Sequence, residues 1–131
     1  MFETNVFGIV RVMNAFIPLL ERSTAPVVVN VGSGMGSLAV TSDPTRLESQ
    51  LNGIGYPSSK SAVNMITSQY AKGLPRFRIN VVDPGYTATD LNGHRGTQTI
   101  EEGAAIIVRM ASIGADGPTG SFVAASGPVA W

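Results

Sequence analysis

The chain has 131 residues, 44% of them hydrophobic and 14% charged, and its nine basic residues balance its nine acidic ones. This length suits one domain, and the lack of a basic surplus argues against a nucleic-acid or anionic-membrane partner. The sequence has no cysteine, a single histidine and no apolar stretch long enough to span a bilayer, so we expect no metal site and a cytoplasmic protein that uses a cofactor or binds a small molecule.

Hydrophobic periodicity predicts helices that alternate with short, β-branched strands. In chain order, we expect a helix over about 2–22, a strand over 27–31, a glycine-rich loop over 32–37, a polar insertion over 43–53, a helix over 56–72, a strand over 78–82, an irregular stretch over 83–96, a helix over 99–111 and a strand over 121–124. The first helical pattern is under way at Phe2 without a capping residue, so we expect part of the domain to precede residue 1.

This alternation argues for right-handed βαβ units and a parallel sheet. The predicted fold class is α/β, a partial Rossmann-type parallel sheet of about three strands, forming a single partial domain over 1–131. Two of the helices show a predicted buried face, made of Ala62, Val63, Ile66 and Tyr70 in one and of Ala104, Ile107, Val108 and Ala111 in the other.

Candidate site residues follow the predicted strands directly. Ligands bind at the carboxyl ends of the strands in parallel sheets of this kind. Ser33 follows one strand and Pro84-Gly85 follows the next, while the helix that begins at Tyr56 starts on the same side. The topology therefore brings these residues toward one crevice.

Tyr56-Pro-Ser-Ser-Lys60 places a phenol and an ammonium four residues apart, where a helix stacks them on one face. A free tyrosine has a pKa of about 10 and exchanges protons poorly at neutral pH. A nearby cation favours the phenolate, so the pair could act as acid or base near neutral pH. An exposed tyrosine beside a solvated lysine is the simpler interpretation of this motif alone, and the surrounding motifs decide between the two.

The ordered set of motifs resembles the short-chain dehydrogenase/reductase family. The resemblance covers essentially the whole chain but only the C-terminal half or so of a family member, and the tail resembles carbonyl-reductase-like members. It rests on a helix start, a serine after an apolar strand, the tyrosine–lysine motif and a Pro-Gly loop: Asn5-Val-Phe-Gly8, Ser33, Tyr56-x-x-x-Lys60 and Pro84-Gly85-Tyr-Thr-Ala-Thr89.

The resemblance implies a catalytic role for four residues. Tyr56 would exchange a proton with the substrate oxygen while hydride moves between the substrate carbon and the nicotinamide. Lys60 would favour the tyrosinate and hold the nicotinamide ribose hydroxyls. Ser33 would hydrogen-bond the substrate carbonyl, and Asn5 would fix a water in a proton relay that ends near Lys60. A plain turn serine and a polar residue near a helix start are the alternatives for Ser33 and Asn5.

The resemblance also implies the cofactor, NAD or NADP, and a small carbonyl or alcohol substrate. Pro84 and Gly85 would shape the wall beside the nicotinamide, Thr87 would meet the carboxamide through its backbone, and Thr89 would add a hydroxyl contact. The choice between NAD and NADP, the substrate, the reaction direction and the oligomeric state are not readable from these residues.

A glycine-rich phosphate loop over 32–36 is the competing interpretation. That fingerprint needs glycine or alanine where Ser37 stands, a helix immediately afterwards, and an acidic residue about twenty positions on, where Asn52 stands instead. The residues after Ser37 open a helix poorly. We therefore do not assign phosphate binding to this loop.

The family's phosphate loop and cofactor-discriminating strand belong before residue 1, so we expect a truncated protein with little or no activity by itself. A second hypothesis is a non-catalytic remnant or interaction module. The exposed, apolar edge of the strand over 27–31, or the first helix, would then support self-association or pairing. A third is a natural protein that begins upstream of Met1.

Overall fold

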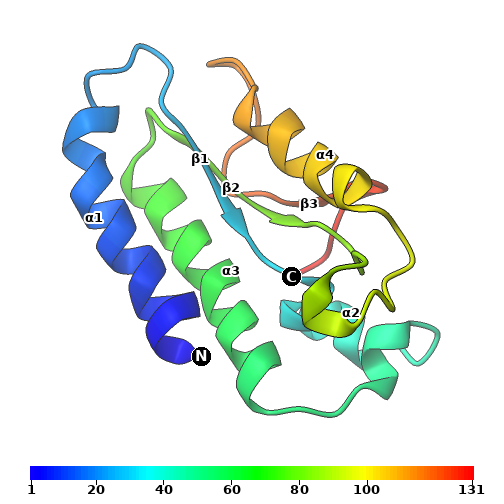
Figure 1. Ribbon diagram of the computed structural model, residues 1–131. Coiled ribbons are helices and arrows are strands. Elements are labelled where there is room, and N and C mark those ends of the chain that lie inside the picture. The colour runs from blue at the N-terminus through cyan, green and yellow to red at the C-terminus, as the bar shows by residue number, and fades with distance from the viewer.

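The computed structural model describes residues 1–131 and shows an open sheet with helices on both faces (Figure 1). No helix is long and apolar enough to cross a membrane. The elements are η1 (Glu3–Phe7), α1 (Gly8–Leu20), β1 (Val27–Val31), η2 (Gly34–Gly36), α2 (Leu38–Ser42), η3 (Leu47–Gln50), α3 (Gly55–Gly73), β2 (Arg78–Asp83), η4 (Asp90–Asn92), α4 (Ile100–Ala111), β3 (Phe122–Ala124) and β4 (Gly127–Pro128).

The sheet has the strand order β1-β2-β3-β4, and its first three strands are parallel, as predicted. Val29 of β1 lies opposite Asn80 of β2, and Val82 of β2 lies opposite Val123 of β3. The fourth strand, β4, was not predicted and pairs antiparallel with β3. A strand of two residues gives no periodicity to detect, and proline is depleted in strands.

The helices cover the two faces of the sheet. Helices α1 and α3 lie on one face, and α4 lies on the other (Figure 1). Along β2, successive side chains point to opposite faces, so Val81 packs with Val63 of α3 while Val82 packs with Ile106 and Met110 of α4. Full burial of such a side chain contributes about 1.5–3 kcal/mol. These two layers fix the carboxyl ends of the strands relative to α3.

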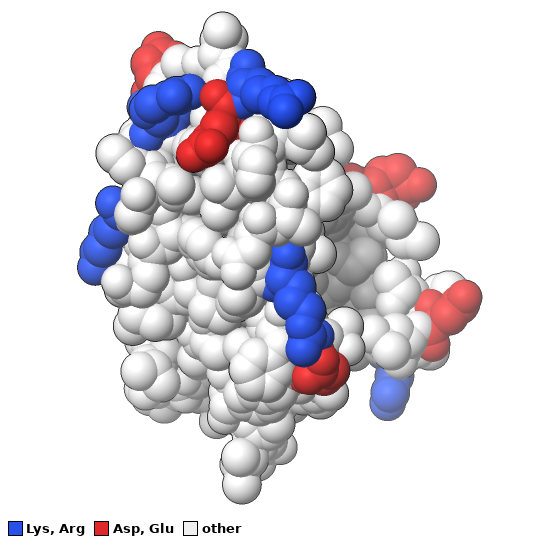
Figure 2. All heavy atoms as spheres, turned by 90° about the vertical axis from the view of Figure 1, so that its left-hand side faces the viewer, with Lys and Arg blue, Asp and Glu red and all other residues white.

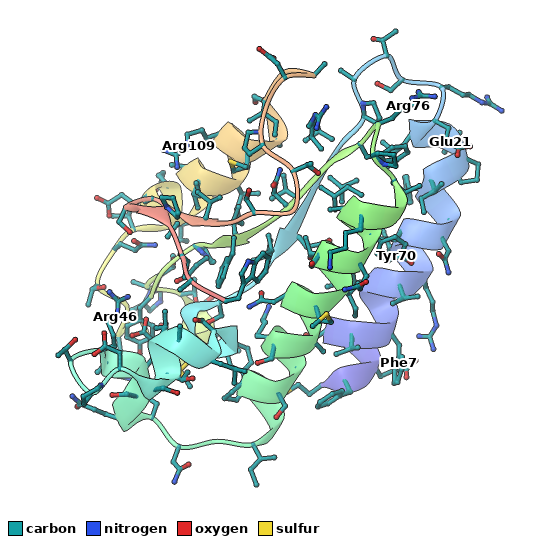
Figure 3. The ribbon with its side chains drawn as sticks, turned by 180° about the vertical axis from the view of Figure 1, so that it is seen from behind. Phe7, Glu21, Arg46, Tyr70, Arg76 and Arg109 are labelled. Atoms are coloured by element: carbon teal, nitrogen blue, oxygen red, sulfur yellow. The ribbon has the colours of Figure 1, made fainter.

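Helix α3 combines apolar and polar packing. Val63 is buried as predicted, and the other residues of the predicted face are partly buried. Thr67 is also fully buried, and its hydroxyl accepts from Asn30 Nδ2 of β1 at 2.9 Å. Where α1 and α3 lie side by side (Figure 3), the Tyr70 hydroxyl donates to Asn14 Oδ1 of α1 at 2.9 Å.

The predicted buried face of α4 was wrong by about one residue. Of the expected residues, Val108 is 63% exposed and Ala111 is exposed, whereas Ala104 and Ile107 are partly buried. The buried residues are Gly103, Ile106 and Met110. Apart from the charged side formed by Glu101, Glu102 and Arg109, apolar and small residues make a broad face, so the sequence leaves the exact phase open. The close approach of the helix at Gly103 to the loop after β2 decides it.

The segment after the glycine-rich loop was also predicted wrongly. It forms the short helix α2, although we expected a poor helix start there. Ser37 caps this helix: its Oγ accepts from the Val40 N–H at 2.9 Å and donates to the Ala130 carbonyl at 2.7 Å. A serine N-cap satisfies an otherwise unpaired amide, and the contact with the chain's tail holds the cap in place.

Candidate active site

Tyr56 and Lys60 lie together at the start of α3. Tyr56 stands in the first turn of the helix, and the Lys60 Nζ lies 5.7 Å from the centre of its ring. The same Nζ donates to the Val31 carbonyl at the end of β1, at 2.9 Å. Tyr56 is 42% exposed, and its hydroxyl has no hydrogen bond within the chain, so it is free to meet a ligand.

Partial burial lowers the pKa of Lys60 from its ordinary value, and the carboxylate of Asp83 opposes this shift. Burial disfavours the charged form of an amine, whereas a nearby negative charge favours it. Lys60 carries three N–H donors when protonated, and the bond to Val31 uses one of them. Two donors remain for a ligand beside Tyr56.

Ser33 follows β1 and caps the short turn η2. Its Oγ accepts a hydrogen bond from the Met35 N–H at 3.2 Å, and the Ser33 hydroxyl donates to no group in the chain. A serine hydroxyl can accept and donate at the same time. The Ser33 proton is therefore available to a carbonyl oxygen at this place.

Helix α3 also holds the loop that carries Ser33. The Ser61 hydroxyl and the Asn64 amide both donate to the Gly36 carbonyl, at 2.9 and 3.1 Å. A Cβ at Gly36 would lie 2.6 Å from the backbone of Lys60, so only glycine allows this approach. The loop is thus anchored to α3 next to the tyrosine–lysine pair, which fixes the Ser33 backbone relative to that pair.

Asn5 lies in the π-helical turn η1, where the Gly8 N–H bonds back to the Glu3 carbonyl. Its amide donates to Ser59 Oγ at 3.1 Å, and that hydroxyl donates to the Tyr56 carbonyl at 2.8 Å. π-helical turns often occur at functional sites. Asn5 therefore joins the first turn of α3 through Ser59, and no hydrogen bond joins it to Lys60.

The loop after β2 is held by its own side chains. Gly85 has φ +78°, which favours glycine, and its N–H donates to Asp83 Oδ1 at 3.0 Å. The Gln98 amide donates to the Pro84 carbonyl and, at 3.0 Å, to Thr87 Oγ1. Pro84 and Gly85 are thus fixed directly beyond β2, next to the end of β1.

Thr87 and Thr89 lie further along the same loop. The Asn92 amide donates to the Thr87 carbonyl at 2.8 Å, and the Thr89 N–H donates to Asn92 Oδ1 at 3.2 Å. The Thr87 N–H has no acceptor within the chain. No hydrogen bond links either threonine to Tyr56 or Lys60.

A cavity of about 520 Å³ adjoins this cluster at the carboxyl ends of β2 and β3. Asp83, Pro84 and Gly85 line one side, and Arg46 and Glu48 of the polar insertion line another. Figure 3 shows Arg46 on this insertion, well away from α1. The tyrosine, lysine and serine of the cluster do not line the cavity, so it lies beside the candidate reaction centre and does not enclose it.

Sequence reasoning missed the residues that support this site. Ser59, Ser61, Asn64 and Gln98 each orient a candidate residue or its loop, but none carries a motif of its own. A usable signal was present in α3, where the buried polar residues Ser59 and Asn64 occur beside the apolar stripe. Polar side chains on a face that packs against the protein need partners, and here those partners are Asn5 and the Tyr56 carbonyl for Ser59 and the Gly36 carbonyl for Asn64.

The chain is similar in sequence to known proteins of one family. A family profile described as short chain dehydrogenase matches residues 1–100. The chain belongs to the short-chain dehydrogenase family. It is 34% identical to (+)-neomenthol dehydrogenase of Capsicum annuum and 32% identical to salutaridine reductase of Papaver bracteatum, over 92% of this chain and 49% of each relative. These matches confirm the family that the motifs indicated.

Solved structures agree with this assignment. Salutaridine reductase from Papaver somniferum superposes with a TM-score of 0.79 at 33% identity, over 90% of this chain and 51% of that one. An NADPH-bound carbonyl reductase from chicken fatty liver gives 0.81 at 22% identity, which shows the shared fold alone. The predicted Rossmann-type α/β class is confirmed. This short-chain dehydrogenase chain spans about half the length of the relatives that it matches.

Proposed function

We propose that this chain carries the reaction centre of an NAD(P)-dependent oxidoreductase that interconverts a small carbonyl compound and an alcohol. The observation that carries the proposal is the Tyr56–Lys60 pair, a free phenol beside a partly buried ammonium. Membership of the family, whose matched relatives are named dehydrogenases and reductases, supports it.

In the reducing direction, Tyr56 gives its proton to the carbonyl oxygen while hydride reaches the carbonyl carbon, so the product is an alcohol. The ammonium of Lys60 stabilises the tyrosinate that is left behind. Ser33 donates its free hydroxyl proton in a hydrogen bond to the same oxygen, where negative charge develops. The bound nicotinamide cofactor supplies the hydride, and the oxidising direction reverses each transfer.

Asn5 supports the return of a proton to Tyr56. We place it as the residue that orients a water in a relay near Lys60. Its hydrogen bond to Ser59, which in turn bonds the Tyr56 carbonyl, holds it at the first turn of α3. The half-buried Asn5 side chain keeps its amide oxygen free of partners in the chain, so this oxygen is the atom that would accept from the water.

The residues present fit the nicotinamide end of a cofactor. The two remaining donors of Lys60 suit ribose hydroxyls, and the unpaired Thr87 N–H suits a carboxamide oxygen. Pro84 and Gly85 form the adjoining wall, and the hydroxyl of Thr89 adds a polar contact. These contacts are the same for NAD and NADP.

Reduced nicotinamide mononucleotide tests this fit, because it carries only the part of the cofactor that these residues would hold. In an NMR titration of the 131-residue chain, we expect saturable shifts of the Gly85 and Thr87 amide signals. Lys60→Met should weaken binding roughly tenfold, the loss of about 1.4 kcal/mol. Lys72→Met, on the exposed side of the same helix, is the control. Absence of these shifts, or equal binding by Lys60→Met, would contradict the proposal.

Turnover tests the proton donor. We expect little or no reduction of a reactive dicarbonyl by NADPH with residues 1–131 alone. Any measured rate should fall by about 100-fold or more in Tyr56→Phe, the usual scale of general acid catalysis. Tyr86→Phe is a matched control, because Tyr86 is 46% exposed and Tyr56 is 42% exposed. Robust turnover that Tyr56→Phe leaves unchanged would exclude the assigned role.

The second candidate function is that of an interaction module without catalysis, which pairs with itself or with another chain. The observation that favours it is the position of β1 at the end of the sheet, with β2 as its only strand partner. Size-exclusion chromatography of the chain provides a first test. A discrete dimer would support self-association, whereas a compact monomer would count against it.

A further inference from the structure

The cavity of about 520 Å³ beside the candidate reaction centre is larger than a reacting carbonyl group needs. Part of its wall comes from the end of the chain, where Ala124, Ala125 and Ala130 contribute small side chains. Cavities that bind small molecules span about 300–1,000 Å³. This cavity can therefore hold the remainder of a substrate whose carbonyl group lies at Ser33 and Tyr56.

Asp83 connects the cavity with the reaction centre. It is the last residue of β2, it lines the cavity, and its carboxylate acts on the charge of Lys60. A Cβ at Gly34 would lie 3.1 Å from Asp83 Oδ2, so this oxygen lies against the residue that follows Ser33. Asp83 Oδ1 accepts from the Gly85 N–H, whereas Oδ2 accepts from no group in the chain.

Glu48 of η3 approaches the same glycine. A Cβ at Gly34 would lie only 2.8 Å from Glu48 Oε1, so the glycine leaves the room that this carboxylate occupies. The Glu48 side chain is 22% exposed, and Oε1 accepts no hydrogen bond within the chain. Two carboxylate oxygens without donors therefore come together beside Ser33.

The lining of the cavity carries a surplus of negative charge. Its charged side chains are three carboxylates and one guanidinium, those of Asp43, Glu48, Asp83 and Arg46. The Arg46 Nε lies 3.6 Å from Glu48 Oε2, so the guanidinium offsets one carboxylate. Neither of the two aspartates has an ion-pair partner within the chain.

This surplus is local, because charges elsewhere are balanced. The chain has nine basic and nine acidic residues. On the side of the molecule that α1 forms, acidic side chains lie next to basic ones (Figure 2), and Glu3 pairs with Arg11. The cavity therefore differs from the rest of the surface in its charge.

An uncharged side chain adds a further acceptor to the lining. The Gln98 amide nitrogen donates to the Pro84 carbonyl and to Thr87 Oγ1, which leaves the amide oxygen without a partner. An ionised carboxylate only accepts hydrogen bonds, and so does this amide once its nitrogen is engaged. A ligand that meets these groups must donate hydrogen bonds or carry positive charge.

We propose that the substrate is a carbonyl compound that carries a positively charged amine, and that Asp83 and Glu48 select it. The carbonyl group lies at Ser33 and Tyr56, and the cationic part extends into the cavity. Partly buried charges are screened much less by salt than exposed ones, so these two carboxylates discriminate by charge. The inference rests on the proposed function and deepens it.

Two ketones of the same shape isolate the effect of charge. The N,N-dimethyl-4-oxopiperidinium ion is permanently cationic, and 4,4-dimethylcyclohexanone is its neutral counterpart. In NMR titrations of the 131-residue chain, we expect the cation to bind at least about tenfold more tightly, a difference of about 1.4 kcal/mol. The amide signals of Gly34 and Gly85 should shift on binding.

The critical variants are Asp83→Asn and Glu48→Gln, which each remove one charge and keep the size of the side chain. Asparagine also keeps an oxygen for the Gly85 N–H. Each variant should lower the preference for the cation at least about threefold. A purely structural effect would weaken both ketones alike and leave their ratio unchanged.

Arg46→Met should have the opposite effect and raise the affinity for the cation, because it removes the guanidinium beside Glu48. Glu21→Gln is the control. Glu21 is exposed and lies at the far end of the molecule from Arg46 (Figure 3). The amide spectrum of each variant establishes that it is folded.

Equal affinity for the two ketones would overturn the inference, as would a preference that Asp83→Asn and Glu48→Gln leave unchanged. Titration of the same samples with reduced nicotinamide mononucleotide tests the proposed function separately. A chain that binds the mononucleotide but treats the ketones alike loses the substrate class alone. A chain that prefers the cation but does not bind the mononucleotide loses the oxidoreductase assignment and keeps a cation-binding cavity.

Discussion

The two edge strands of the sheet, β1 and β4, differ in length and in residue type. At one end, β4 has only two residues, one of them Pro128, and Gly127 turns the chain back with φ +123°. At the other end, β1 has five residues, four of them valine, and no proline. Short, proline-bearing edge strands limit pairing with other chains, whereas long apolar edges invite it.

The β4 end is also covered by the tail and the insertion. The Trp131 ring lies 5.7 Å from the Phe122 ring, centre to centre, and the Trp131 carbonyl accepts from the Ala39 N–H at 3.1 Å. Ser37 bonds the neighbouring Ala130 carbonyl. The comparison teaches that this chain stabilises one edge internally, while β1 remains an open edge.

Phe122→Ala should have the largest effect, because it leaves a cavity in the core beside β3, near the β4 end of the sheet. Phe122 is buried against Val63 and Val81, and we expect a loss of about 3–5 kcal/mol in the free energy of unfolding. Phe16→Ala on α1, where the side chain is 53% exposed, should cost less than about 1 kcal/mol. Urea denaturation of both variants measures this difference, and equal losses would break the comparison.

Ser37→Ala should have a smaller effect. The fully buried Ser37 hydroxyl caps α2 and bonds the Ala130 carbonyl, so its removal takes the partner from both the Val40 N–H and this carbonyl. The expected loss is about 0.5–2 kcal/mol in the same denaturation experiment, the usual cost of losing a serine cap. Ser42→Ala, at the exposed end of α2, serves as the control. A loss no larger than that of the control would show that the Ser37 contacts do not stabilise the β4 end of the sheet.

Substitution of Lys60 should have the smallest effect on stability. Lys60 lies at the β1 end of the sheet, where its Nζ donates to the Val31 carbonyl. Burial lowers its pKa, so the unfolded chain binds this proton more tightly than the folded chain. The cost of burying the charge is present in full below the lowered pKa, and the free energy of unfolding rises as pH increases from there to the ordinary value of 10.5.

Lys60→Met should abolish this rise, and Lys72→Met should keep it. Urea midpoints measured for both variants between neutral pH and the ordinary lysine pKa compare them under conditions in which the other groups titrate alike. A midpoint that falls with pH in the unmodified chain relative to Lys60→Met would show that the pKa of Lys60 is raised instead.

Much of the framework was predictable from the sequence. The strand over 27–31 was predicted with the bounds that β1 has, and the helix over 56–72 differs from α3 by one residue at each end. The strand is a nearly continuous β-branched run, and Gly73 lies at the end of the helix. The motifs also indicated the correct family, while the catalytic and cofactor roles of their residues remain proposals.

The supporting contacts were not predictable in the same way. Asn5 meets Ser59, and Ser61 and Asn64 share the Gly36 carbonyl, although these partners lie far apart in the sequence. Such pairs depend on the relative position of packed elements, which no local pattern encodes. The predicted phase of α4 was wrong for the same reason, because its apolar face is broad and its neighbours decide which part of that face is buried.

The sequence by itself determined the order of helices and strands, the family and the apolar character of β1, because each depends on local spacing and residue type. The tertiary structure alone decided how α3 holds the Ser33 loop, how the β4 end is closed and which carboxylates line the cavity. These features depend on close approach, strand register and long-range hydrogen bonds, which exist only once distant segments have packed together.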